Sequence, residues 1–97
     1  MSQFMIEFSL SNMDEAFMAK IPAQRAKINE LMEQGHILSY SLAADRSKLW
    51  CIVNADSELE VMETIANFPL IDYMKPDISE LMFNNVVSLR VPMFSLN

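Results

Sequence analysis

The sequence predicts an α+β fold with the element order β-α-β-β-α-β. Three observations predict this order. Four segments alternate between two side-chain faces, two segments carry apolar residues at helical spacing, and capping or turn residues separate the six segments. A chain of 97 residues has the size of one small domain.

Residues 4–10 are the first predicted strand, because their side chains alternate with period two. Aromatic and branched side chains favour this conformation. One face takes Phe4, Ile6, Phe8 and Leu10, and the other takes Met5, Glu7 and Ser9. The first set is wholly apolar, so we expect it to face the helices.

Residues 14–35 have the apolar spacing of a helix, for which Ser11 or Asn12 is the expected N-cap. Pro22 removes a backbone donor inside this run, so we expect either a kink or a short helix followed by a longer one. Gly35 is the only glycine of the chain, and it is expected at the left-handed position that ends the helix.

Residues 36–55 are predicted to form a hairpin, after which Ser57 and Glu60 begin a second helix with an S-x-x-E capping box. That helix is expected to end near Asn67. Residues 77–83 alternate again and are the fourth predicted strand, which closes a domain of residues 1–83. The apolar tail, residues 84–97, is expected to extend across a partner subunit.

This element order is that of the ferredoxin-like fold, an antiparallel sheet with both helices on one face. The other face of the sheet is bare, and two such sheets can pair into a dimeric α/β barrel. Hydrophobic residues make up 52% of the chain, slightly above the usual share of about 45–50%. This surplus favours association with further copies of the chain, or burial around a ligand. The alternative is a Met-rich core with scattered exposed side chains.

The charge balance excludes several classes of partner. The chain has seven basic and thirteen acidic residues, so its net charge is −6. The sequence therefore offers no basic patch that could bind a nucleic acid or an anionic membrane surface. No apolar run approaches a membrane span, and the N-terminus lacks the features of a signal peptide, so we expect a cytoplasmic protein. Cys51 stands alone in an apolar strand, which predicts a buried structural thiol and no metal site.

The bare face of the sheet is the predicted site. Alternation places Leu38, Tyr40 and Leu42, with Leu49, Cys51 and Val53, on the helix side of the hairpin. The opposite side then gathers Glu7, Ser39, Ser41 and Trp50, a semi-polar chamber with an aromatic wall, which is typical of a small-molecule pocket.

Glu7 is the candidate catalytic residue, because burial in an apolar chamber would raise its pKa and suit it to general acid–base catalysis. The alternative is that Glu7 lies at a solvent-open edge or pairs with an arginine across a dimer. Trp50 is either a hydrophobic anchor or a platform for a substrate. Arg25 is either solvated or reaches the mouth of a pocket near Pro22.

The segment FPLIDYM, residues 68–74, places a proline, a tyrosine and four large apolar residues in a predicted loop. Such a loop is part of the core, forms the wall of a pocket, or meets another subunit. If the segment forms the wall of a pocket, it closes the predicted cavity on the bare, barrel-side face of the sheet. It then presents Tyr73 toward that cavity or toward the partner subunit.

Four segments together resemble the muconolactone isomerase-like branch of the dimeric α/β-barrel superfamily: ELMEQG, KLWCIV, SELE and, above all, FPLIDYM. The resemblance covers most of residues 3–83. It implies isomerisation of a lactone by proton transfer, without metal or cofactor, at a subunit interface in a ring of dimers. The chain departs from the family pattern at Met5 and Glu7, where basic residues are usual, and at residues 39–41, where His, Trp and Arg are usual.

The leading hypothesis is therefore a small-molecule isomerase that acts through Glu7 on a lactone or another small carbonyl compound. One alternative is a non-catalytic, oligomeric ligand-binding or accessory protein of the same fold. The other is a cofactor-free monooxygenase.

Overall fold

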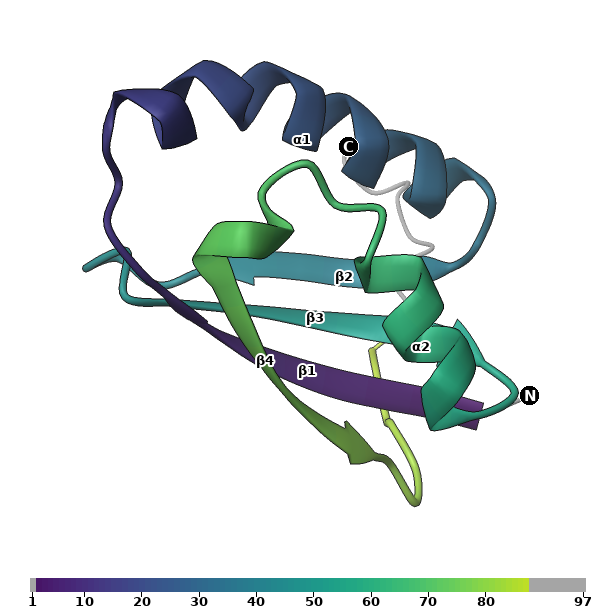
Figure 1. The fold of residues 1–97 in the computed structure, drawn as a ribbon. Coiled ribbons are helices and arrows are strands. Elements are labelled where there is room, and N and C mark those ends of the chain that lie inside the picture. The colour runs from purple at the N-terminus through teal and green to yellow at the C-terminus, as the bar shows by residue number, and fades with distance from the viewer. Residues whose placement is uncertain (1, 88–97) are drawn as a thin grey trace, which may run out of the picture.

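The chain forms one four-stranded antiparallel sheet with the strand order β2-β3-β1-β4 and two covering helices (Figure 1). The structure, a computed structural model, describes residues 2–87. Its elements are β1 (Ser2–Leu10), α1 (Glu15–Glu33), β2 (Ile37–Leu42), β3 (Lys48–Ala55), α2 (Glu58–Ile65), the 3-10 turn η1 (Ile71–Tyr73) and β4 (Met74–Glu80). The predicted ferredoxin-like fold is confirmed.

Helix α1 begins at a cap that differs from the prediction. The carboxylate of Asp14 accepts the backbone N–H of Phe17 at 2.9 Å. Ser11 is not free to cap the helix, because its backbone N–H and its hydroxyl both donate to the carbonyl of Tyr73, at 3.0 and 3.3 Å. Ser11 therefore ties the end of β1 to η1, and the helix starts later.

Helix α1 continues through Pro22, so the expectation of two successive helices was wrong. Pro22 lies on the exposed side of the helix, and the preceding turn contains Met18, whose side chain is 52% exposed. The carbonyl freed by the missing N–H can therefore bind water. The predicted helix end is confirmed: Gly35 has φ +80° and donates to Met32, while the next residue donates to Leu31, which is a Schellman motif.

Strand β2 contains a bulge that changes which side chains face the helices. Ile37 pairs with Val53, but Ser39 pairs with Ile52, so Leu38 is the extra residue. Ile37 is consequently 2% exposed and Leu38 is 43% exposed. Placing Leu38 on the helix side was therefore wrong, because the bulge shifts the alternation by one residue.

The second helix and the last strand follow the prediction with adjusted bounds. The Ser57 hydroxyl accepts the N–H of Glu60 at 3.2 Å, and the Glu60 carboxylate accepts the N–H of Asp56 at 3.0 Å, as a capping box requires. Strand β4 begins at Met74 rather than residue 77, because η1 turns the chain directly back onto β1. Pro76 is tolerated there, since β4 lies at an edge of the sheet.

The segment FPLIDYM belongs to the core. Phe68, Leu70 and Met74 are at most 5% exposed, and the ring of Phe68 lies 6.0 Å from that of Phe8 on β1. Tyr73 makes an edge-to-face contact with Phe17 on α1 at 5.3 Å. The first reading of this loop is therefore confirmed, and its contact with another subunit stays a prediction.

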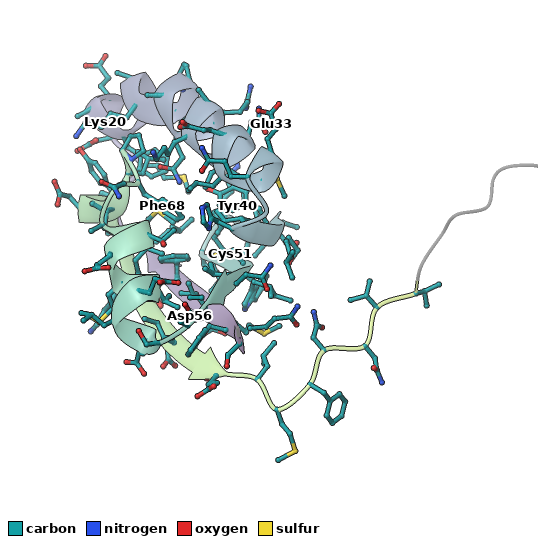
Figure 2. All side chains as sticks on the ribbon, turned by 90° about the vertical axis from the view of Figure 1, so that its right-hand side faces the viewer. Lys20, Glu33, Tyr40, Cys51, Asp56 and Phe68 are labelled. Carbon is teal, nitrogen blue, oxygen red and sulfur yellow. The ribbon has the colours of Figure 1, made fainter. Side chains whose placement is uncertain are left out.

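Beyond β4 the chain leaves the domain. Leu81 still donates to the Gln3 carbonyl at 2.9 Å, but the residues after it extend away from the body of the protein (Figure 2). Met82, Phe83, Val86 and Val87 are 71–95% exposed. The predicted packing of residues 84–97 on a partner stays a prediction, and residues 88–97 lie outside the described part of the chain.

Candidate functional site

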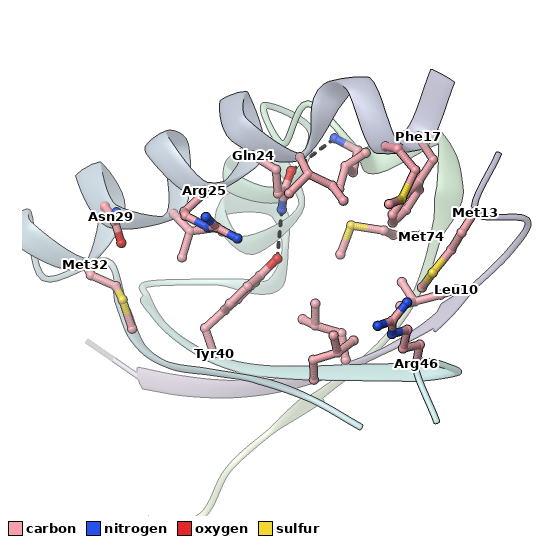
Figure 3. Close-up of a pocket in the computed structure, with 16 residues that line it drawn as sticks. Leu10, Met13, Phe17, Gln24, Arg25, Asn29, Met32, Tyr40, Arg46 and Met74 are labelled. Carbon is pink, nitrogen blue, oxygen red and sulfur yellow. Dashed lines mark hydrogen bonds between the residues drawn. The ribbon is translucent and has the colours of Figure 1, made fainter. Parts of the chain in front are cut away.

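A cavity of ≈ 520 Å³ lies between α1 and the helix-covered face of the sheet (Figure 3). Helix α1, the hairpin of β2 and β3, and the segment that leads into β4 supply its walls. Apolar side chains form most of the lining, namely Leu10, Met13, Phe17, Met18, Ile21, Ile28, Met32, Leu42, Leu49, Leu70 and Met74. The polar lining residues are Gln24, Arg25, Asn29, Tyr40 and Arg46.

Gln24 joins three walls of this cavity. It is only 4% exposed, its Nε2 donates to the hydroxyl of Tyr40 at 3.0 Å, and its Oε1 accepts the backbone N–H of Leu70 at 3.0 Å. Burial raises the pKa of Tyr40, so its hydroxyl stays protonated at neutral pH. Gln24 thus connects α1 to β2 and to the FPLIDYM segment.

Sequence reasoning missed Gln24, although the sequence contained a signal. Phe17, Ile21, Ile28 and Leu31 mark the buried stripe of α1, and Gln24 falls between them at the same helical spacing. A polar residue in an apolar stripe needs hydrogen-bond partners when it is buried. It was therefore a candidate for a fixed polar contact in the core.

Two arginines are the charged residues that line the cavity. Arg25 comes from α1, and Arg46 comes from the hairpin turn, where its φ of +66° is left-handed. The neighbouring Asp45 is already engaged, because its carboxylate accepts the backbone N–H and the hydroxyl of Ser47 at 2.9 and 2.7 Å. The structure thus places Arg25 among the residues that line the cavity, and its predicted role in binding stays a prediction.

The other predicted residues gather on the opposite face of the sheet. Strand pairing sets Ser41, Trp50 and Glu7 side by side across β2, β3 and β1, with Ser39 two residues from Ser41 on the same face. Trp50 Nε1 donates to Glu7 Oε1 at 3.0 Å, and Lys48 Nζ lies 3.2 Å from Glu7 Oε2. Four of the six predicted residues are therefore neighbours, but the sheet separates them from the cavity.

The electrostatics of Glu7 differ from the expectation. The hydrogen bond from Trp50 and the contact with Lys48 lower the pKa of Glu7, whereas a raised pKa was expected. The Glu7 side chain is 43% exposed, so no apolar chamber surrounds it within one chain. The solvent-open alternative describes this carboxylate better, with Lys48 of its own chain as the partner in place of an arginine across a dimer.

Two further residues of interest lie apart from both groups. Tyr73 packs on Phe17, and Lys20 Nζ lies 5.8 Å from the centre of its ring, so the structure does not bring Tyr73 to Glu7. Burial raises the pKa of the Cys51 thiol to about 12. The reading of Cys51 as a buried structural thiol is confirmed.

Residues 2–87 hold no group of three or more His, Cys, Asp and Glu side chains with the arrangement of a metal site. Within the same range, neither helix combines the length and the apolar character of a membrane span.

The sequence profile described as muconolactone delta-isomerase matches residues 3–83. The chain belongs to the muconolactone isomerase family. This match spans all seven elements of the fold and confirms the resemblance that the sequence segments suggested. No curated protein has a matching sequence.

Two solved structures share the fold of this member of the muconolactone isomerase family. Muconolactone isomerase superposes with a TM-score of 0.67 and 17% sequence identity, covering 93% of this chain and 97% of the other. The second is 5-chloro-2-hydroxyhydroquinone dehydrochlorinase (TftG) from Burkholderia phenoliruptrix AC1100, in complex with 2,5-dihydroxybenzoquinone. It superposes with a TM-score of 0.60 and 17% identity, covering 84% of this chain and 95% of the other. At this identity the two structures establish the fold.

Proposed function

We propose that the protein is a small-molecule isomerase that binds a compact carbonyl compound carrying a carboxylate in the cavity between α1 and the sheet. The observation that carries the proposal is the cavity itself: ≈ 520 Å³, apolar walls, and a few polar groups that include two guanidinium ions. Membership in the muconolactone isomerase family supports isomerisation as the reaction and an unsaturated lactone as the first substrate to test.

The walls suit a small, largely apolar ligand. Ligand cavities of about 300–1,000 Å³ are common, and apolar side chains with a few polar groups usually line them. Four methionines contribute to this cavity, Met13, Met18, Met32 and Met74. Methionine side chains adapt to irregular shapes, so the cavity can close around a flat ring.

The charges favour an anion. Arg25 and Arg46 bring the two formal charges of the lining, and both are positive. A planar guanidinium binds a carboxylate through two parallel hydrogen bonds. The chain as a whole carries a net charge of −6, so a small positive region gives an anionic ligand one preferred place to bind.

Isomerisation also needs a proton acceptor. A base removes a proton from the carbon beside the carbonyl, the electron pair moves onto the carbonyl oxygen, and protonation at another carbon moves the double bond. Among residues 2–87, no Asp, Glu, His or Lys lines the cavity. Glu7 remains the proposed base, and because it faces the other side of the sheet, it can act only on a ligand that reaches that face in the assembled protein.

This separation favours a second candidate function, ligand binding without turnover in the same cavity. We also propose that the open face of the sheet binds a second copy of the chain. Met5 on that face is 39% exposed, and the half-buried Trp50 lies on β3 opposite Glu7. A homodimer would cover these side chains and exclude water from Glu7.

Proton exchange in deuterium oxide distinguishes the two functions. Unsaturated γ-lactones with a carboxylate substituent are incubated with the protein, and NMR follows the loss of the proton beside the carbonyl. Exchange with formation of an isomer supports the isomerase, and Glu7→Gln should then abolish exchange. Ligand binding without exchange supports the binding function.

The cavity itself is tested with a matched pair of variants. Arg25→Met should raise KM, or the dissociation constant, at least about tenfold, which corresponds to about 1.4 kcal/mol. Lys27→Met removes a cation from the same helix outside the cavity and should change neither value. If no carboxylate-bearing lactone binds, both proposed functions are wrong.

A further inference from the structure

Resting on the proposed function, we propose that Tyr40 donates the hydrogen bond that receives the carbonyl oxygen of the ligand, and that Gln24 is the positioning residue that fixes this direction. Tyr40 would then be the group that selects a ligand with a carbonyl oxygen at this place in the cavity. The inference follows from the direction of two hydrogen bonds in the cavity wall.

The first bond sets the orientation of the Gln24 amide. The backbone N–H of Leu70 can only donate, so the atom 3.0 Å from it must be the amide oxygen of Gln24. Leu70 and Gln24 are 5% and 4% exposed, so water does not compete for this contact. The amide nitrogen is therefore the atom that faces Tyr40.

The second bond sets the direction of the Tyr40 hydroxyl. An amide nitrogen can only donate, so the oxygen of Tyr40 accepts from Gln24 at 3.0 Å and its own proton must point elsewhere. Among residues 2–87 the structure gives this proton no acceptor. Because Tyr40 lines the cavity, the free proton is available to a ligand bound there (Figure 3).

The surroundings keep this hydroxyl a donor. Burial raises the pKa of Tyr40, so the phenol does not ionise at neutral pH. Apolar groups such as Leu49 and Met74 line the same cavity. A hydrogen bond to a carbonyl oxygen is stronger in such surroundings than in water, and a donor that is already held in place loses little freedom when the ligand binds.

This arrangement also determines specificity. A ligand with a carbonyl oxygen at this position accepts the Tyr40 proton. A ligand with a bare methylene there leaves the proton without an acceptor, so it binds more weakly. The predicted ligand therefore has a carbonyl acceptor for Tyr40 and an anionic group that an arginine of the lining can bind.

Two probe molecules test the inference directly. 4-Oxocyclohexanecarboxylate carries a ketone, and cyclohexanecarboxylate is the same ring without it. Calorimetry should show that the wild-type protein binds the ketone about tenfold more tightly, which corresponds to about 1.4 kcal/mol. Tyr40→Phe should remove this preference while leaving the affinity for cyclohexanecarboxylate unchanged. Infrared spectra of the ¹³C-labelled ketone should show a carbonyl band shifted to lower wavenumber in the wild type and not in Tyr40→Phe.

The variant Gln24→Glu distinguishes a positioning role of residue 24 from a merely structural one. Only a positioning role makes the carbonyl band of the bound ketone depend on pH in this variant. At about pH 9 the introduced carboxylate is ionised even if burial raises its pKa, and it accepts both from Leu70 and from Tyr40. The Tyr40 proton then points away from the cavity, and the carbonyl shift is lost. When the pH falls below the pKa of the introduced carboxyl, the carboxyl is protonated and donates to Tyr40, so the shift returns. If this variant does not fold, the spectra of Tyr40→Phe decide.

The outcomes separate this inference from the proposed function. An unchanged carbonyl band in Tyr40→Phe, with both probes still bound, overturns the role of Tyr40 and leaves the cavity as the binding site. Failure of the wild-type protein to bind either probe overturns the proposed binding site and the inference with it.

Discussion

The two faces of the sheet use alternate residues of the same strands for different purposes. On β1, Phe4 and Phe8 point toward the helices and are 2% and 0% exposed, whereas Met5 is 39% exposed and the Glu7 side chain is 43% exposed. The covered face holds the core and the cavity. The open face holds a hydrogen-bonded carboxylate with an aromatic and a lysine neighbour. Folding therefore depends on one face, while the other remains available for association.

The largest effect is expected on the covered face. Phe68→Ala removes a ring that is 1% exposed and that packs on Phe8. The free energy of unfolding should fall by about 3–5 kcal/mol, because the ring leaves a cavity that the core cannot fill. Urea denaturation measures the change, and Phe83→Ala, at a ring that is 71% exposed, is the control that should alter it little.

A smaller loss of stability is expected when the polar contact of Gln24 on the covered face is removed. Gln24→Leu keeps the volume but leaves the buried N–H of Leu70 without its acceptor. The free energy of unfolding should fall by about 1–3 kcal/mol. Tyr40→Phe should lower the free energy of unfolding by less, because it removes only the acceptor of the Gln24 amide nitrogen and leaves the Leu70 contact intact. Equal losses in the two variants would show that the amide of Gln24 does not hold the loop.

On the open face, a substitution should affect association and leave folding unchanged. Met5→Lys places a charge among apolar side chains that a second copy would cover. The dissociation constant of the dimer should rise at least about tenfold, which corresponds to about 1.4 kcal/mol, in sedimentation equilibrium. Met62→Lys, on α2 at 51% exposure, is the matched control. Equal association in the two variants would remove the open face as the interface.

The smallest expected effect is on the pH dependence of stability, to which Glu7 contributes. Its folded pKa lies below the ordinary value of 4.5, so its contacts stabilise the fold above that pH, and the stabilisation is lost as the pH falls through the folded pKa. Glu7→Gln should therefore make the free energy of unfolding depend less on pH below about 4.5. A steeper dependence in the variant would mean that the contacts with Trp50 and Lys48 do not form in solution.

Much of the fold could be predicted because its signals are local. Gly35 and the pair Ser57 and Glu60 each act within a few residues. They correctly predicted the C-terminal end of α1 and the N-terminal end of α2. The bulge at Leu38 could not be predicted, because pairing with β3 decides it. The N-cap was misplaced for the same reason, since Ser11 is held by Tyr73 from 62 positions away.

The candidate site was harder to predict than the fold. Polar side chains on alternating strands were easy to group, and Glu7, Trp50 and Ser41 are indeed neighbours. The lowered pKa of Glu7 depends on Trp50 and Lys48, 43 and 41 positions away, so the direction of the shift could not be predicted from the strand alone. The cavity escaped notice because most residues that line it look like core residues in the sequence.

The edges of the sheet have a consequence for how copies of this chain can meet. An unpaired edge strand can add strands from neighbouring molecules without limit and so start aggregation. Here β2 is the edge with the bulge at Leu38, and β4 is the edge with Pro76. Irregular pairing and a missing N–H both hinder the growth of a continuous ribbon. Both features therefore oppose open-ended polymerisation of a chain that has nine methionines and six phenylalanines.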